Sequence, residues 1–473
     1  MYDVNSKHAD DFINHEEILD TLTYADENKN NKTLIESLIE KAALRKGLPH
    51  REASVLLACD DPEMNEKIFR LAEQIKKDFY GNRIVLFAPL YLSNYCVNGC
   101  TYCPYHLKNN HIARKKLSQE EIRREVIALQ DMGHKRLALE AGEDPVHNTM
   151  EYYLDSINTI YSIKHKNGAI RRVNINIAAT TVDNYRLLKE AEVGTYILFQ
   201  ETYHKESYLN LHPTGPKHDY NYHTEAMDRA MEGGIDDVGI GVLFGLDKYR
   251  YEFAGLLMHA EHLEAAFGVG PHTISVPRLR DADDIDSSSF TNGIDDDTFA
   301  KIVACIRIAV PYTGMIISTR ESQATRERVL HLGVSQISGG SKTSVGGYCE
   351  PEPDDEKSEQ FDVIDNRTLD EVVQWLMKMD YLPSFCTACY REGRTGDRFM
   401  SLCKNGQIQN CCHPNALMTL QEYLMDYATL ETKRIGDMLI DKEVLNVPNE
   451  KTRQIVLENL RLIRENNRRD FRF

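Results

Sequence analysis

The chain lacks a long uncharged apolar segment, and its N-terminus is not a basic region followed by an apolar one. The first absence disfavours a membrane-spanning helix and the second disfavours a secretory signal, so we expect a cytoplasmic protein without a membrane partner. Positive charge is also scarce, because 56 Lys and Arg stand against 73 Asp and Glu, a formal net charge of -17. This balance disfavours nucleic acid as a partner and favours a small-molecule substrate.

Length and cysteine usage narrow the class of protein further. At 473 residues the chain is longer than one simple core requires, so a barrel-sized domain with additions is expected. It has eleven cysteines, and six of them fall in two clustered motifs. Without a secretory signal, clustered cysteines indicate metal ligands rather than disulfides.

The pattern along the chain predicts an α/β fold with three parts. Residues 1–80 show helical apolar spacing and predict an N-terminal helical layer. Residues 81–345 predict a (β/α)8 barrel, because eight β-rich runs are each followed by a helical segment. The runs are Ile84–Leu90, Arg136–Glu140, Val173–Ala179, Tyr196–Gln200, Val238–Leu243, Thr273–Val276, Met315–Ser318 and Ser335–Ser338. An acidic linker over 346–365 then leads to a mostly helical C-terminal domain, 366–473.

The first cysteine motif follows the first predicted strand. Cys96, Cys100 and Cys103 have the spacing C-x3-C-x2-C, and three thiolates can hold three irons of a [4Fe–4S] cube while the fourth iron stays open. A tetrahedral zinc site that uses His106 is the alternative. The aromatic Tyr102 and the apolar run before the loop count against zinc.

This loop resembles the signature of the radical S-adenosylmethionine (SAM) enzymes, in which SAM chelates the open iron. The resemblance implies a first cofactor made of a [4Fe–4S] cluster with SAM, held at the carboxyl ends of the barrel strands. The fifth strand resembles the glycine-rich strand that packs against adenine in this family, although spaced glycines in a strand are also typical of tight packing between elements. The cofactor-binding residues implied by the resemblance are Tyr102, Ala141, Gly142, Glu143, Glu201, Gly239 and Gly241.

Arginines follow the sixth and seventh strands and are candidates for the substrate site. A guanidinium group matches a carboxylate with two parallel donors. We expect Arg280 to form a salt bridge with the acidic loop Asp281–Asp286, and Arg320 to bind substrate because it shares strand parity with Ser318. The predicted catalytic set is Arg320, Arg278 and Ser318. The surrounding segments resemble the radical SAM lyases of aromatic amino acids, which points to L-tyrosine.

A second cysteine motif lies in the C-terminal part. Cys386 and Cys389 are separated by two residues, and Cys412 follows after 22 more, with Cys411 also available as the third ligand. Spacing alone leaves a structural zinc site open, in which His413 completes the tetrahedron. The motif, placed after a tyrosine-lyase barrel, resembles the HydG type of lyase, the maturases of [FeFe]-hydrogenase.

That resemblance implies cleavage of the Cα–Cβ bond of L-tyrosine to p-cresol and dehydroglycine, followed by formation of carbon monoxide and cyanide. It implies an auxiliary [4Fe–4S] cluster with an additional iron, which delivers an iron synthon for assembly of the hydrogenase H-cluster under anaerobic conditions. Implied partners are a free cysteine as a non-protein iron ligand, a reducing electron donor and other hydrogenase maturases. The alternatives are a tyrosine lyase of thiamine thiazole synthesis with a structural zinc cap, and a cluster scaffold without radical chemistry.

The resemblance also implies a histidine ligand for the additional iron. His259 and His262 lie on one predicted helix, and His262 falls opposite its apolar stripe, where we expect it to be solvated. His272 opens the sixth strand, at the barrel end away from the first cysteine loop. We therefore predict His272 as the ligand, on the expectation that the C-terminal domain closes that end.

Overall fold

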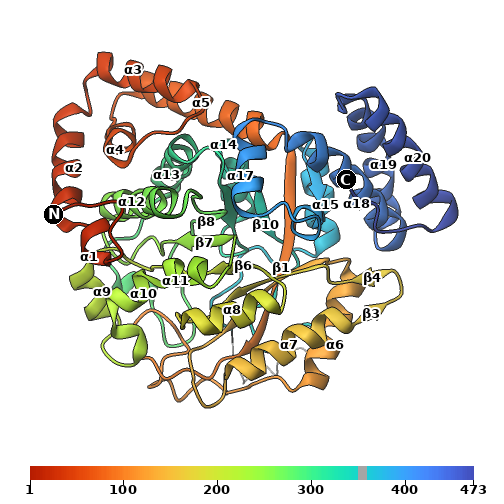
Figure 1. Cartoon of the computed structure of the whole chain (residues 1–473), viewed down its shortest axis with the longest axis horizontal. Coiled ribbons are helices and arrows are strands. Elements are labelled where there is room, and N and C mark those ends of the chain that lie inside the picture. Colours follow the sequence, from red (N-terminus) through yellow and green to blue (C-terminus); the bar gives the residue numbers. More distant parts are fainter. Residues whose placement is uncertain (350–358) are drawn as a thin grey trace.

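The computed structural model describes residues 1–349 and 359–473. Its first 80 residues form the predicted helical layer, which packs on helices of the barrel (Figure 1). Its helices are α1 (Ala9–Phe12), α2 (His15–Asn28), α3 (Lys32–Ala43), α4 (His50–Ala58) and α5 (Pro62–Tyr80). Helix α5 shows why the sequence folds this way: Asp61 caps it by accepting from the Met64 backbone N–H, and Pro62 occupies the first turn.

The N-terminal layer corrects one expectation. His262 is buried rather than solvated, because the segment around α1 covers the face of the helix that carries it. Its ring stacks on Phe12 with centroids 3.8 Å apart, its Nδ1 donates to the Val4 carbonyl over 2.7 Å, and its Nε2 lies 2.9 Å from Asp228 Oδ1. Helical periodicity could not reveal this second covering layer, since it comes from a distant part of the chain.

The central sheet is a closed parallel barrel, as predicted. Its strands follow the order β1, β2, β5, β6, β7, β8, β9, β10, and β10 pairs with β1 to close the ring. The strands are β1 (Arg83–Ser93), β2 (Arg136–Ala141), β5 (Arg172–Asn176), β6 (Val193–Ile197), β7 (Val238–Gly241), β8 (Thr273–Ser275), β9 (Gly314–Ile317) and β10 (Gln336–Ser338). All eight predicted runs contribute a strand. Strands β5 and β6 end before the predicted residues 179 and 200, because the chain there leaves the ladder to form the mouth of the barrel.

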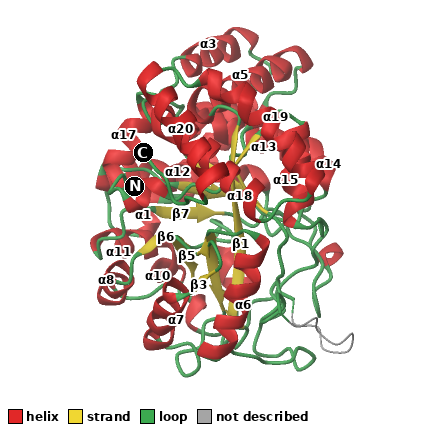
Figure 2. Cartoon of the chain, turned by 90° about the vertical axis from the view of Figure 1, so that its right-hand side faces the viewer, coloured by secondary structure: helices red, strands yellow, loops and turns green. Residues whose placement is uncertain are grey.

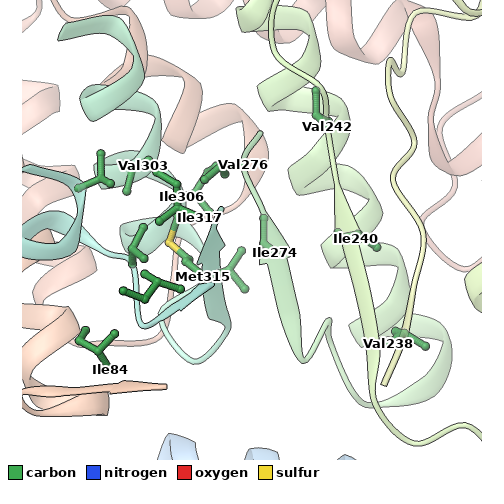
Figure 3. Packing of buried hydrophobic residues seen from close by; sticks show 14 of the residues in the cluster. Ile84, Val238, Ile240, Val242, Ile274, Val276, Val303, Ile306, Met315 and Ile317 are labelled. Carbon is green, nitrogen blue, oxygen red and sulfur yellow. The ribbon is translucent and has the colours of Figure 1, made fainter. Parts of the chain in front are cut away.

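Alternation along the strands divides the core into two parts. Along β7 and the residue after it, Val238, Ile240 and Val242 occupy alternate positions and are buried on one side of the strand. The glycines between them lie on the other side. On β9, Ile317 belongs to the same apolar core as Ile306 of helix α13 (Asp296–Ala309), and Figure 3 shows them side by side. This buried layer between strands and helices fixes the barrel, and it leaves the inward positions for the site.

The remaining helices of the barrel cover the outside of the sheet (Figure 2). They are α6 (Gln119–Met132), α7 (Met150–Ser162), α8 (Val182–Glu190), α9 (Lys205–Leu211), α10 (Tyr220–Thr224), α11 (Ala226–Glu232), α12 (Tyr249–Phe267) and α14 (Gln323–Leu332). Helix α6 begins with a capping box of Ser118 and Glu121 and ends at Gly133 with a φ of 101°. A short hairpin, β3 (Lys164–His165) with β4 (Gly168–Ala169), follows α7.

The C-terminal domain attaches to the amino-terminal end of the barrel. Its strand β11 (Leu382–Ser384) pairs in parallel with the start of β1, so that Arg83 faces Leu382. Its helices are α15 (Leu369–Lys378), α16 (Ala388–Arg391), α17 (Gly396–Lys404), α18 (Gln409–Asp426), α19 (Leu430–Glu443) and α20 (Glu450–Asn466). Figure 1 shows the long orange strand β1 meeting these blue helices. The sequence did not predict β11, because a three-residue strand has no periodicity to detect.

A buried ion-pair group joins this domain to the barrel. Glu422 of α18 lies 2.7 Å from Lys135 Nζ and 3.2 Å from Arg171 Nη1, and the Lys135 and Glu422 side chains are fully buried. Removing one member of such a group leaves an unpaired buried charge, which costs about 3–5 kcal/mol. The two domains are therefore fixed against each other. No helix within the described ranges is long and apolar enough to cross a membrane.

The predicted linker, residues 346–365, is only partly described, because residues 350–358 lie outside the described ranges. Directly after that gap, Phe361 is buried rather than solvated. Gln360 accepts a hydrogen bond from Tyr91 Oη over 2.8 Å, and its backbone N–H donates to the Thr343 carbonyl. The end of the predicted linker therefore covers the mouth of the barrel. Charge alone suggested a solvated connection and could not reveal the apolar contact.

Candidate active site and second cysteine site

The three cysteines of the first motif line one cavity at the mouth of the barrel. They lie on the loop after β1, where parallel strands present their carboxyl ends. Burial raises the pKa of the Cys103 thiol to about 12, and it also raises the pKa values of Cys96 and Cys100. Such thiols keep their protons unless a metal cation replaces them.

Arg114 holds this loop in place from outside the cavity. Its guanidinium donates to the carbonyl groups of Asn94, Tyr105 and His106 over 2.6–2.9 Å, so that both ends of the cysteine loop are tied to one side chain. His106, considered as a zinc ligand, turns its Nε2 toward Asp284 Oδ2 at 3.2 Å. One ring nitrogen of His106 is therefore engaged by a residue of another loop rather than turned toward the cysteines.

The segment after β2 forms the next wall of the cavity. Ala141, Gly142 and Glu143 all line it, and their contact with the cofactor stays a prediction. A Cβ on Gly142 would lie 2.4 Å from the Tyr95 carbonyl oxygen and 3.0 Å from the Cys96 Cβ. Glycine is needed there because the cysteine loop packs directly on this segment.

Glu201 also lines the cavity, and the structure pairs it with Lys217, a residue that sequence reasoning missed. Lys217 Nζ lies 2.9 Å from Glu201 Oε1. Burial alone would lower the pKa of Lys217, but Glu201 and the nearby thiols more than offset this and raise it. The Gly215-Pro216 turn before Lys217 was the only signal in the sequence. Tyr102 lines the same cavity, and its hydroxyl lies 2.7 Å from His212 Nε2.

Arg320 and Ser318 lie at the end of β9 and line a second, inner cavity inside the barrel, as parity predicts. Arg320 faces both cavities. Its guanidinium carbon lies 3.7 Å from the centre of the Phe361 ring, and burial lowers its pKa. Among the described residues, none accepts a hydrogen bond from its guanidinium group. A buried cation without a carboxylate of its own is suited to an anionic ligand.

Arg278 is not among the described residues that line either cavity, and its catalytic role stays a prediction. Its guanidinium forms a bidentate pair with Glu321 and lies 2.7 Å from Asp296 Oδ1. Arg280 also pairs with Glu321, so the predicted salt bridge is present but its partner is not the Asp281–Asp286 loop. Glu321 therefore neutralises both arginines, whereas Arg320 has no carboxylate partner among the described residues.

Gly239 and Gly241 pack closely against neighbouring strands, and their contact with the cofactor stays a prediction. A Cβ on Gly239 would lie 2.4 Å from Thr273 Oγ1, and one on Gly241 would lie 2.8 Å from the Phe199 ring. These glycines let neighbouring strands approach inside the barrel. Leu243, beyond them on the same segment, lines the mouth cavity instead.

Glu140 is a second residue that sequence reasoning missed as part of the site. It is at the end of β2 and lines both cavities together with Asn176 and Arg320. Burial raises its pKa to about 8, although a hydrogen bond with Asn176 and the charge of Arg320 act in the opposite direction. Its inward parity with Ala138 was the available signal.

The second cysteine set assembles at the other end of the barrel. Cys386 and Cys389 flank the start of α16, and Cys412 lies in the first turn of α18. A hydrogen bond from Cys389 and the nearby Arg83 lower the pKa of Cys412 to about 6, whereas burial raises that of Cys386 to about 11. Cys412 thus lies within hydrogen-bonding reach of Cys389, and its choice over Cys411 as the third ligand stays a prediction.

Positive charge surrounds this second set. Arg136 Nη2 donates to the Cys386 carbonyl over 2.9 Å, and Arg394 hydrogen bonds with Cys389. His413 turns its Nε2 to the Glu443 carbonyl at 3.0 Å, so the zinc alternative has lost one nitrogen of its proposed ligand.

His272 lies at this end of the barrel, as expected. It is buried against Phe399 of α17, with ring centroids 4.7 Å apart, and its Nδ1 lies 3.4 Å from Asp237 Oδ1. Burial lowers its pKa to about 4, so the imidazole is neutral and can act as a metal ligand. No contact between its ring and a thiol occurs among the described residues.

Within the described ranges no three His, Cys, Asp or Glu side chains already converge as a metal site, but the types of donor fit the groups that the cysteine motifs imply. Three soft thiols on one loop surround the mouth cavity, and Lys217 supplies a compensating positive charge. The same cavity offers the Ala141–Glu143 segment for a polar ligand beside the thiols. Three further thiols with arginine neighbours form the second set.

Comparisons with known proteins agree with this geometry. A profile of the radical SAM superfamily matches residues 90–257, and a profile of the biotin and thiamin synthesis associated domain matches residues 275–382. The 2-iminoacetate synthase of Escherichia coli (strain K12) is 29% identical over 356 residues, which are 75% of this chain and 90% of that protein.

Two solved structures are similar over nearly the whole chain. One is the crystal structure of HydG, a maturase of the [FeFe]-hydrogenase, whose sequence is 54% identical to this chain. The match covers 98% of this chain and 100% of the HydG chain, with a TM-score of 0.94. The FeFe-hydrogenase maturase HydG from Carboxydothermus hydrogenoformans is 39% identical, with coverage of 96% and 99% and a TM-score of 0.83.

Proposed function

The chain belongs to the HydG family of radical SAM enzymes, and from this premise we propose that it cleaves the Cα–Cβ bond of L-tyrosine to p-cresol and dehydroglycine and forms carbon monoxide and cyanide from the second product. The observation that carries the proposal is the presence of two separate cysteine sets, one at each end of a single barrel, with Arg320 at the inner cavity. A lyase that released dehydroglycine unchanged would need only the first set.

The residues at the mouth cavity divide the work. Cys96, Cys100 and Cys103 hold the first cluster, and the Ala141–Glu143 segment, Glu201 and Tyr102 bind SAM. When bound, this cluster and SAM supply a 5'-deoxyadenosyl radical. The buried walls exclude water from the cavity and so protect reactive species.

The inner cavity receives tyrosine. Arg320 binds the substrate carboxylate with two parallel hydrogen bonds, and Ser318 holds the Arg320 backbone through its Oγ over 3.3 Å. The phenol ring is accommodated by the aromatic side chains that line the cavity, which include Phe87, Tyr91, Phe199 and Phe361. The pair formed by Arg320 and the substrate carboxylate holds the amino-acid end of tyrosine toward the mouth cavity, where the SAM site lies.

The second set, Cys386, Cys389 and Cys412, holds the auxiliary cluster with its additional iron. That group supplies open iron positions for carbon monoxide and cyanide, and a free cysteine and His272 complete its ligands. The neutral imidazole of His272 suits this role. The product is an iron synthon for the H-cluster, passed to other hydrogenase maturases, and a reducing electron donor starts each turnover.

The thiamine-type lyase with a zinc cap is the weaker candidate. Similarity to the 2-iminoacetate synthase extends over 75% of the chain, whereas both HydG structures cover at least 96%. The contact of His413 with Glu443 also removes one nitrogen from the zinc set.

Metal analysis and product assays on anaerobically purified protein test the proposal. We expect about eight or nine irons per chain without zinc, formation of p-cresol from L-tyrosine, and infrared bands of iron-bound carbon monoxide. Cys96→Ala should abolish p-cresol, because a cube that lacks one thiolate no longer presents SAM at its open iron. Retention of p-cresol by Cys96→Ala, or about four irons together with one zinc, would contradict the proposal.

A further inference from the structure

Glu140 occupies a distinctive place in the site. Of the described carboxylates, only Glu140 lines both the mouth cavity and the inner cavity. It directly precedes the Ala141–Glu143 segment and shares both cavities with Arg320. A carboxylate therefore stands between the position of the cofactor and the cation that binds the substrate carboxylate.

The other two carboxylates of the mouth cavity already have strong partners. Glu143 Oε2 accepts a hydrogen bond from Asn98 over 2.7 Å, and Glu201 pairs with Lys217 at 2.9 Å. Within the part of the chain that the structure describes, Glu140 has only the amide of Asn176 as a hydrogen-bond partner, with Arg320 as a neighbouring charge. It is thus the carboxylate that remains available to a ligand.

Three groups on neighbouring elements face Glu140. Asn176 of β5 hydrogen bonds with it, the guanidinium of Arg320 after β9 attracts it, and the Tyr91 hydroxyl of β1 lies close enough that Glu140 helps to raise the pKa of Tyr91. Tyr91 donates to Gln360 and stays neutral. When Glu140 is ionised, Arg320 and Glu140 together present one positive and one negative group, as an α-amino acid requires.

We propose that Glu140 recognises the α-ammonium group of the substrate and takes one of its protons, so that the substrate reacts as a neutral amine. One N–H bond of the ammonium breaks, a new O–H bond forms on the Glu140 carboxylate, and the proton stays there during the reaction. No electron is transferred in this step. The carboxylate becomes a neutral acid while the ammonium becomes a neutral amine.

The physical reason lies in the charge that would otherwise develop. Removal of a hydrogen atom from an ammonium would leave a cationic radical in a buried site next to Arg320, where like charges repel strongly. Removal from a neutral amine leaves a neutral radical. Because burial sets the pKa of Glu140 near 8, close to that of an α-ammonium group, proton transfer between them is nearly balanced.

The inference rests on the proposed function, and a binding experiment tests it apart from turnover. Equilibrium dialysis of the anaerobic holoenzyme would compare L-tyrosine with 3-(4-hydroxyphenyl)propanoate, which has the same carboxylate and phenol but no amino group. We expect the wild type to prefer tyrosine by roughly 10- to 100-fold. Glu140→Gln should bring this ratio close to one and leave the affinity for the propanoate unchanged. A wild-type ratio retained by Glu140→Gln would overturn the proposal.

Turnover supplies a second readout. Glu140→Gln should lower the rate of p-cresol formation by about 100-fold or more, since general-base catalysis is lost. In the wild type, kcat/KM should rise with pH up to about 8, whereas the residual rate of Glu140→Gln should keep rising at higher pH, where tyrosine loses its ammonium proton to solvent. Glu431→Gln, an exposed change on α19, is the matched control. A Glu140→Gln variant with an unchanged pH profile would contradict the role of Glu140, whereas a wild type that forms no p-cresol would contradict the proposed function itself.

Discussion

Arg320 is held ready for an anion by the way its neighbours are paired. Glu321, the next residue, is occupied by Arg278 and Arg280, so it cannot neutralise Arg320. Phe361 covers the flat face of the guanidinium and leaves its N–H groups free for a ligand in the plane. A single carboxylate entering the inner cavity would therefore gain a desolvated, charged partner.

Arg320→Ala should raise the concentration of tyrosine needed for half-maximal p-cresol formation by an amount equivalent to about 2–5 kcal/mol, because the substrate carboxylate would be buried unpaired. SAM cleavage without tyrosine should remain largely intact. Arg434→Ala, an exposed change on α19, is the control. Unchanged tyrosine dependence in Arg320→Ala would return this arginine to a structural role.

The site could be predicted from the sequence where spacing carries the chemistry. The cysteines and the Ala141–Glu143 segment meet at one cavity because motif and strand end coincide. Lys217 and Phe361 could not be predicted, since they reach the cavity from a helical turn and from the covering segment, without a local pattern. The pairing of Arg278 with Glu321 could not be predicted either, because Glu321 follows a different strand.

Among the elements, β1 shows how much one strand can organise. It has eleven residues, whereas β8 and β10 have three each. Its apolar run predicted the strand, but not its partner β11, which pairs with the start of β1 at the amino-terminal end of the barrel. The eight strands were predictable because alternating β and α segments leave few topologies. The segment around Phe361 covers the mouth of the barrel, and the C-terminal domain covers its amino-terminal end. Both depend on contacts between segments that are far apart in the sequence, so local patterns could not predict them.

Helix α4 is attached to the barrel through His50, and this attachment should depend on pH. His50 Nδ1 lies 2.8 Å from Glu261 Oε2, and its Nε2 lies 3.1 Å from Glu17 Oε1. Burial alone would lower the pKa of His50, but these two carboxylates more than offset it and raise the pKa. The stabilisation is therefore fully present below the unfolded-state pKa of about 6.5 and is lost as pH rises through the folded-state pKa.

We expect the melting temperature of the wild type to exceed that of His50→Gln most at about pH 6 and by less as pH rises toward about 9. Differential scanning calorimetry at several pH values measures this difference. Glu52→Gln, on the same helix but paired with Lys41, should show no such trend. A difference that is constant or grows with pH would contradict the assigned charge on His50.

Across the whole molecule, the two cysteine sets lie at opposite ends of one rigid barrel. Arg83, at the start of β1, contacts Cys412, and the Cys96 loop follows the other end of the same strand. A strand of this length spans roughly 30 Å. The mouth cavity, where we propose the radical chemistry, and the second cysteine set are therefore separated by the length of the barrel.

The division of labour is tested most directly with Cys389→Ser, by measuring p-cresol by chromatography and iron-bound carbon monoxide by infrared absorption in the same reaction. We expect p-cresol to form substantially as in the wild type, because the radical is generated and consumed at the mouth cavity. The iron-bound carbon monoxide bands should disappear, because a soft ligand of the second set is lost. Cys411→Ser, at the neighbouring thiol, should retain both signals. Loss of p-cresol with the first cluster still filled, or retention of the carbon monoxide bands, would contradict this account.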